Sequence, residues 1–205
     1  MDVYKLYIQT LLQPVSVCDR ASSFSLSRQN VNEGAVFVAS LSALVTVATN
    51  KFLEIPEKMN NLFADNVMLL LYNPFGYFFA NLVFLFLLIY TIFSFGKNSR
   101  VKRDFNEIGK IVVWICFVAL GFQVLQLLSV ASLSNFFMIF YILERIWLVW
   151  ALSSVVCEIY DYRSVLLTAV TGFIVVNVLY ILCLMFFILI FLMVLPIFND
   201  GSMNV

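Results

Sequence analysis

The chain contains no histidine, and few of its side chains carry a charge. Among its 205 residues there is no His, and Asp, Glu, Lys and Arg together make up 12%. Without His, the chain cannot use Ser-His or Cys-His catalysis, a His-Glu-x-x-His zinc site or His-ligated haem. A soluble domain usually has about 25% charged residues. This chain therefore cannot cover a globular fold with polar surface.

Cysteine spacing and net charge exclude further classes of protein. The four cysteines, Cys18, Cys116, Cys157 and Cys183, are scattered without C-x-x-C spacing, so we expect neither a disulfide framework nor a thiol-metal site. Basic and acidic residues balance to a formal net charge of zero, which gives no indication of nucleic acid as a partner. No carboxylate pair, Ser-Lys motif or metal-ligand spacing is present. We therefore expect no enzyme activity and no cofactor.

The chain is rich in long apolar runs. Hydrophobic residues make up 63% of the chain, and several runs reach the roughly 20 residues that span a bilayer core. The sequence predicts an all-α polytopic membrane protein with five transmembrane helices, at about 34–53, 74–95, 111–133, 136–157 and 165–190. These helices form one domain over 34–198, preceded by an N-terminal segment, 1–33, and followed by a tail, 199–205.

Three segments depart from this scheme of straight crossings. Residues 1–13 put Tyr4, Tyr7 and Leu11 at helical spacing, which favours a short amphipathic helix in the membrane interface, with packing on the rest of the protein as the alternative. Residues 62–73 are expected to be an interfacial or re-entrant piece, and Pro74 suits the first turn of the following helix. The last apolar run, 165–198, is too long for a straight span, so we expect it to tilt or to end in an interfacial stretch near Pro196.

Basic residues indicate the orientation in the membrane. The loop between the second and third crossings carries Lys97, Arg100, Lys102, Arg103 and Lys110. With a cytoplasmic N-terminus, the outer side holds only Lys51 and Lys58. The positive-inside rule therefore predicts a cytoplasmic N-terminus and a C-terminus outside. The basic loop is interpreted first as a topology determinant and second as a contact for anionic lipid.

A layer of polar residues interrupts the apolar runs at similar depth. It consists of Gln123, Gln126, Glu144, Arg145 and Asn177. A charge at the centre of a crossing helix costs about 2.5–3.5 kcal/mol, so both charges need partners. Neighbours on a helix point roughly 100° apart, so Glu144 and Arg145 are expected to face different helices. We expect Gln123 and Gln126 to meet one charge and Asn177 to meet the other.

Three stretches resemble the bacterial branch of the Yip-domain family. They are "YNPFGYFFANLVFLFLLIY", "FNEIGKIVVWICFVALGFQVLQLL" and "LVWALSSVVCEIYDYRSVLLTAVTGFIV", and the matching positions are Pro74, Phe105, Trp114, Gln123, Glu158, Tyr162 and Ser164. The resemblance covers roughly residues 60–180. It implies five helices and a cytoplasmic N-terminus in a bacterial inner membrane, without a settled activity. The chain departs from the family pattern at Asn98-Ser99, where Gly-Gly is usual, and at Asp161, where His is usual. Eukaryotic relatives bind small GTPases through a long N-terminal region, for which residues 1–33 are too short.

Two functions fit these observations. The first is a non-catalytic membrane scaffold or adaptor, which contacts the lipid bilayer and other membrane proteins or a second copy of itself. The alternative is a small transporter or channel subunit that uses the polar layer, because intramembrane ionisable residues often mark a substrate path. Polar side chains between helices also act as interhelical glue. A water-accessible cavity that reaches Glu144 would favour transport.

Overall fold

The computed structural model describes residues 3–21, 28–53, 73–96, 101, 103–132 and 136–200. Within these ranges the regular structure is helical, as predicted. The helices are α1 (Val3–Leu12), α2 (Ser16–Ala21), α3 (Arg28–Phe52), α5 (Pro74–Gly96), α6 (Phe105–Ser132), α7 (Phe137–Tyr160) and α8 (Val165–Asp200). The predicted interfacial piece up to residue 72 and most of the basic loop (Lys97, Arg100 and Lys102) lie outside the described residues.

Four helices, α3, α5, α6 and α7, are long and apolar enough to cross a membrane. The first four predicted crossings lie on these helices, but several ends differ. α6 begins at Phe105 rather than near residue 111, because its first turn holds Glu107, which suits a helix N-terminus. Arg103 lies 3.5 Å from Glu107 and stabilises the same turn. α3 begins at Arg28, inside the segment assigned to the N-terminal region.

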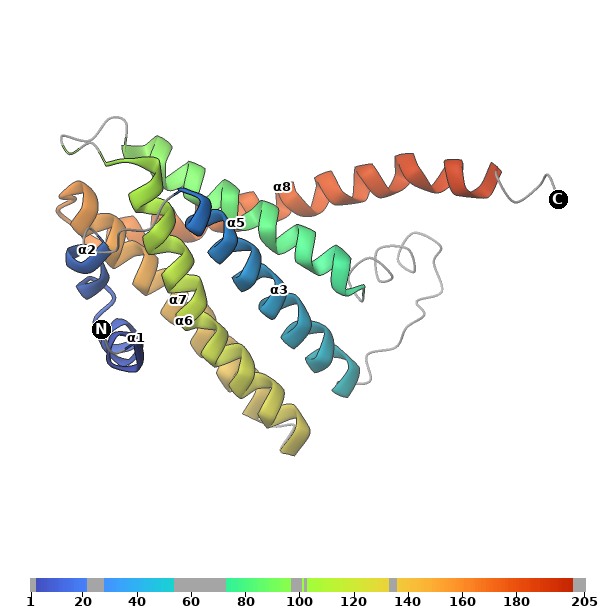
Figure 1. The fold of residues 1–205 in the computed structure, drawn as a ribbon, viewed down its shortest axis with the longest axis horizontal. Coiled ribbons are helices and arrows are strands. Elements are labelled where there is room, and N and C mark those ends of the chain that lie inside the picture. The colour runs from blue at the N-terminus through green and yellow to red at the C-terminus, as the bar shows by residue number, and fades with distance from the viewer. Residues whose placement is uncertain are drawn as a thin grey trace.

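The last helix, α8, differs from the predicted fifth crossing. It has 36 residues, and at about 1.5 Å per residue it is about 54 Å long, against a hydrocarbon core of roughly 30 Å. The helix continues past Pro196 to Asp200 instead of ending there. Figure 1 shows its second half extending beyond the other helices. Among the residues whose side chains the structure describes, α8 contributes the apolar stretch Val165–Leu179.

The five long helices are arranged as a ring. α3 packs on α5 and on α6, α6 packs on α7, α7 on α8, and α8 on α5. Figure 1 shows α5 and α6 close together where α5 ends and α6 begins, and diverging toward the other end of each helix. The ring is therefore tight at one end and wider at the other.

The hydrophobic core lies at the tight end, where α5 ends and α6 begins. Its buried members from α5, α6 and α7 include Ile89, Ile92, Ile108, Ile115, Val155 and Ile159. Gly96 permits a close approach there, because a Cβ at this position would overlap the ring of Tyr160. The Tyr160 hydroxyl donates a hydrogen bond to the carbonyl of Ile92 at 3.0 Å. Packing thus closes this end of the ring.

Local capping signals set the ends of α5, α7 and α8. Pro74 is the first residue of α5, as predicted, and the Asn73 side chain accepts a hydrogen bond from the Phe75 N–H at 2.9 Å. Asp161 ends α7 in a left-handed conformation (φ 54°, ψ 45°), and its N–H bonds to the carbonyl of Cys157. Ser164 then caps α8 by accepting from the Leu167 N–H at 3.2 Å. These residues reverse the chain between the last two helices.

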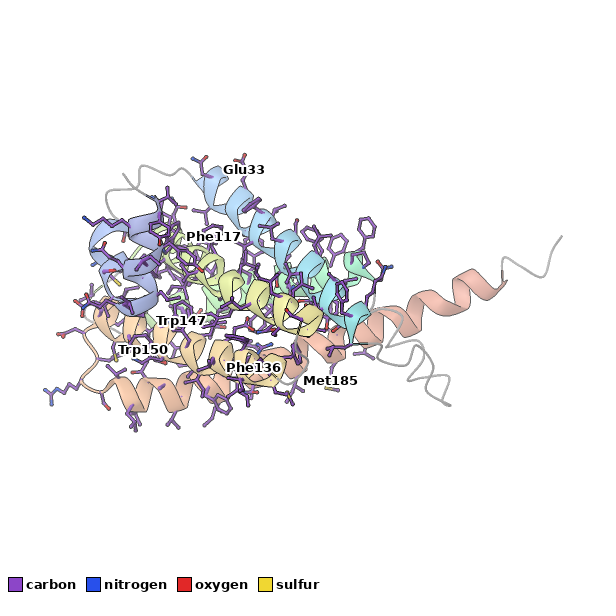
Figure 2. The ribbon with its side chains drawn as sticks, turned by 90° about the horizontal axis from the view of Figure 1, so that it is seen from below. Glu33, Phe117, Phe136, Trp147, Trp150 and Met185 are labelled. Atoms are coloured by element: carbon purple, nitrogen blue, oxygen red, sulfur yellow. The ribbon has the colours of Figure 1, made fainter. Side chains whose placement is uncertain are left out.

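The two short N-terminal helices pack against α6 and α7. Leu6 and Thr10 of α1 and Val17 of α2 are buried in this contact. Figure 2 shows Phe117 and Trp147 on the side of the bundle that these helices cover. The alternative interpretation, packing on the rest of the protein, therefore describes α1. Its location in a membrane interface stays a prediction.

Three hydrogen bonds hold α1 in place. The Tyr7 hydroxyl donates to the carbonyl of Val118 at 3.1 Å. Burial raises the pKa of Tyr7. The indole N–H of Trp114 donates to Thr10 at 2.9 Å, and that of Trp147 donates to the carbonyl of Leu11 at 2.9 Å. Val118 lies half-way along α6. α1 is thus beside the middle of α6 and not beside its end.

Candidate functional site

A buried carboxylate cluster joins α6 and α7. Glu144 is only 2% exposed and points from α7 toward α6. Gln123 donates its side-chain N–H to Glu144 Oε1 at 2.9 Å, and Gln126 donates to Oε2 at 2.7 Å. The two glutamines are three residues apart on one helix face, so both can reach the same carboxylate. The predicted contact of one charge with both glutamines is therefore confirmed.

The cluster retains unused acceptors. Gln123 Oε1 is buried and has no hydrogen-bond partner within the described part of the chain. An ionised carboxylate offers about four acceptor positions, of which the two amides use one on each oxygen. Buried carboxylates usually pair with a cation. Among the described residues, Glu144 has no such ion pair.

Arg145 and Asn177 do not pair with each other, contrary to the prediction. The guanidinium of Arg145 lies over the ring of Tyr141, 5.2 Å from its centroid, in a cation–π contact one turn away on α7. The amide of Asn177 donates to the carbonyl of Phe173 on its own helix at 2.7 Å. Local partners within each helix thus replace the expected contact between helices.

The cluster lies nearer one end of the bundle than the sequence predicts. Glu144 is seven residues after the first residue of α7, about 10 Å along the axis. α6 and α7 both continue beyond the predicted crossings at their other ends, to Phe105 and Tyr160. Because both helices are longer than predicted at the end away from Glu144, their midpoints lie farther from Glu144 than predicted.

A cavity of about 920 Å³ lies inside the helix ring. All five long helices contribute to its lining. Every member of the predicted polar layer lines it, namely Gln123, Gln126, Glu144, Arg145 and Asn177. The five residues therefore share one cavity, although only three of them are joined by side-chain hydrogen bonds.

The cavity follows α5 along most of its length. Its lining on α5 runs from Gly76 to Phe95, about 28 Å at 1.5 Å per residue. Polar side chains are present along this path and not only beside Glu144. They include Ser42, Asn81, Thr91, Ser153, Thr168 and Thr171. Hydrogen-bonding groups thus line the cavity toward both ends of the bundle.

Sequence reasoning missed the hydroxyl groups of this lining. Ser153 donates to the carbonyl of Val149 at 2.6 Å, and Thr168 donates to that of Ser164 at 3.0 Å. Ser and Thr commonly make such bonds to a carbonyl four residues earlier in a helix, so these residues do not indicate a cavity from sequence alone. The signal that could have found them is spacing. Ser164, directly before α8, and Thr168 and Thr171 on α8 recur at helical intervals, and all three line the cavity.

Among the described residues, neither a metal site nor the basic loop is part of this cavity. Within the described ranges, no group of three His, Cys, Asp or Glu side chains could hold a metal ion. Of the predicted basic loop, the structure describes Arg103, paired with Glu107, and Lys110, which lies within the first turns of α6. Neither residue lines the cavity.

The chemistry of the site has to be interpreted from its own residues. It combines a buried carboxylate, two amides, a guanidinium and a row of hydroxyl groups around one cavity. Comparison with known proteins identified no relative: no family model, curated protein or solved structure matches this chain.

Proposed function

We propose that the protein is a non-catalytic membrane transporter that binds a small polar or amphipathic molecule at the Glu144 cluster. The observation that carries this proposal is the cavity, which reaches Glu144 and follows α5 from Gly76 to Phe95. A binding site inside the membrane needs space, polar groups and a path to both surfaces. The cavity supplies the space, and polar groups line it along α5; transport requires that it open to both surfaces.

The cavity favours the transporter over the scaffold, the two functions that the sequence left open. In a scaffold, polar side chains between helices serve as packing contacts and border no open space. Here Glu144, Gln123 and Gln126 bond to one another and also border a cavity of about 920 Å³. Ligand pockets commonly measure about 300–1,000 Å³. The space thus suits a ligand better than it suits a packing role alone.

The proposal includes α8 as a fifth, tilted crossing. Its first half packs on α7 and α5 and contributes to the cavity lining. Its other face exposes large apolar side chains, with Leu166 77% exposed and Val170, Ile174 and Val178 also exposed and outside the cavity lining. Such a face suits lipid. The proposed orientation places the N-terminus in the cytoplasm of a bacterial inner membrane. It rests on the distribution of basic residues and on the resemblance to the Yip-domain family. That resemblance stays a prediction.

Reporter fusions test the number of crossings. A fusion at Lys102 should report the cytoplasm, and a fusion at Met203 should report the outside, because the three proposed crossings α6, α7 and α8 separate these two positions. Alkaline phosphatase and green fluorescent protein activities in intact cells provide complementary readouts. If both fusions report the same side, α8 does not cross, and the ring has four transmembrane helices.

Cysteine labelling tests whether water reaches the cavity. In a variant whose four native cysteines are replaced by Ala, Thr171→Cys should react with a membrane-impermeant methanethiosulfonate reagent, because Thr171 lines the cavity. Ile174→Cys is the matched control, since Ile174 lies three residues further on α8 and is 57% exposed outside the cavity. It should react slowly, because a thiol surrounded by lipid forms little thiolate. Labelling is measured by mass spectrometry after reconstitution in vesicles.

Equal, slow labelling of both variants would contradict the transport proposal. The cavity would then be closed to water, and the scaffold would be the better explanation of the cluster. A third variant, Ser42→Cys, extends the test toward the wider end of the ring, since Ser42 also lines the cavity.

A further inference from the structure

Two opposite charges face the same cavity without neutralising each other. Glu144 and Arg145 are adjacent on α7 and both line the cavity. Glu144 is bound by two neutral amides, and Arg145 lies over Tyr141. No ion pair joins them within the described residues. Both side chains therefore border the cavity with their charges not neutralised by each other.

The Glu144 side of the site offers acceptors. The carboxylate has acceptor positions beyond the two that Gln123 and Gln126 occupy. Gln123 Oε1 adds a buried acceptor without a partner among the described residues. An ammonium group has up to three N–H donors and a positive charge. It matches this set in both hydrogen bonding and charge.

The Arg145 side offers donors. A guanidinium presents five N–H donors in a planar fork, which suits carboxylate and phosphate groups. The Arg145 side chain is exposed, and its ring contact with Tyr141 leaves the edge of the fork available for hydrogen bonds. An anionic group fits here, one residue along α7 from the acceptors.

We propose that the cavity binds a zwitterion, with its ammonium group at Glu144 and Gln123 and its anionic group at Arg145. This inference rests on the proposed transport function and specifies its ligand class. A simple cation would be repelled by Arg145, and a simple anion by Glu144, because charges interact strongly in a medium of low dielectric constant. A zwitterion is attracted by both. The same chemistry occurs in a free amino-phosphate or amino-acid solute and in the headgroup of an ethanolamine phospholipid.

Probes with hydrocarbon chains of matched length test the charge requirement. Purified full-length protein in maltoside micelles is titrated with lysophosphatidylethanolamine (zwitterionic), lysophosphatidylglycerol (anionic) or an alkylammonium (cationic), and binding is followed as a shift in melting temperature. The zwitterionic probe should bind most tightly. Equal binding of the anionic or the cationic probe would overturn the proposal.

Two variants connect binding to the named residues. Glu144→Gln and Arg145→Gln should each weaken zwitterion binding by about tenfold or more, the loss expected for a charge-assisted hydrogen bond. Arg103→Gln is the control, because it also removes a positive charge but does not line the cavity. Unchanged affinity in both cavity variants would overturn the assignment. Their melting temperatures without ligand show whether the fold is retained.

Tail-free glycerophosphoethanolamine, which has the same net charge as the lysolipid, distinguishes the two sources of the ligand. If it binds as well as the lysolipid, the ligand is a free solute. If only the tailed probe binds, the ligand is a lipid headgroup. Absence of zwitterion binding, together with rapid labelling of Thr171→Cys, would overturn this inference and leave the transport function standing.

Discussion

Glu144→Leu should strongly destabilise the protein. The substitution removes both acceptors of the amide hydrogen bonds from Gln123 and Gln126. Each buried donor left without a partner costs about 1–3 kcal/mol, so we expect a loss of about 2–6 kcal/mol. Thermal unfolding of the purified protein in detergent, followed by circular dichroism, measures the change.

Glu144→Gln is the matched control and should change the stability by less than about 1 kcal/mol. Its amide keeps one acceptor oxygen for Gln126, and its new N–H group can bond to Gln123 Oε1, which lacks a partner among the described residues. Equal destabilisation by Leu and by Gln would contradict this account. It would show that the negative charge, and not hydrogen-bond satisfaction, stabilises the contact between α6 and α7.

Leu6→Ala should release α1 from the rest of the protein. The Leu6 side chain is 1% exposed, and truncating a buried leucine costs about 2–5 kcal/mol. Because α1 has only ten residues, a loss of this size should shift it from the docked toward the undocked state, against the hydrogen bonds of Tyr7, Thr10 and Leu11 that remain. Limited proteolysis of the N-terminal segment and the fluorescence of Trp147, which bonds to Leu11, report the release.

Leu12→Ala provides the comparison on the same helix. Leu12 is 67% exposed, so its truncation should change stability by less than about 0.5 kcal/mol. Equal protease sensitivity in both variants would contradict the docking seen here. It would instead favour the interfacial location predicted from the amphipathic pattern of residues 1–13.

The sequence by itself determined the class of the protein and its helices. Low charge and long apolar runs leave an all-helical membrane protein as the expectation, because backbone groups in lipid must be satisfied within each segment. Pro74 correctly marks the start of α5, where Asn73 supplies the cap. That Gln123, Gln126 and Glu144 share one level also follows from residue numbers, because rise per residue along a helix is constant. Their contact could therefore be predicted.

Only the tertiary structure decided what these helices enclose. The predicted pairing of Arg145 with Asn177 is wrong, because each side chain finds a local partner on its own helix, and depth alone does not fix the direction of a side chain. The docking of α1 depends on Trp114 and Trp147, which lie more than 100 residues away in sequence. The cavity arises from the way five helices splay around one another. That geometry depends on packing between helices, and no single segment encodes it.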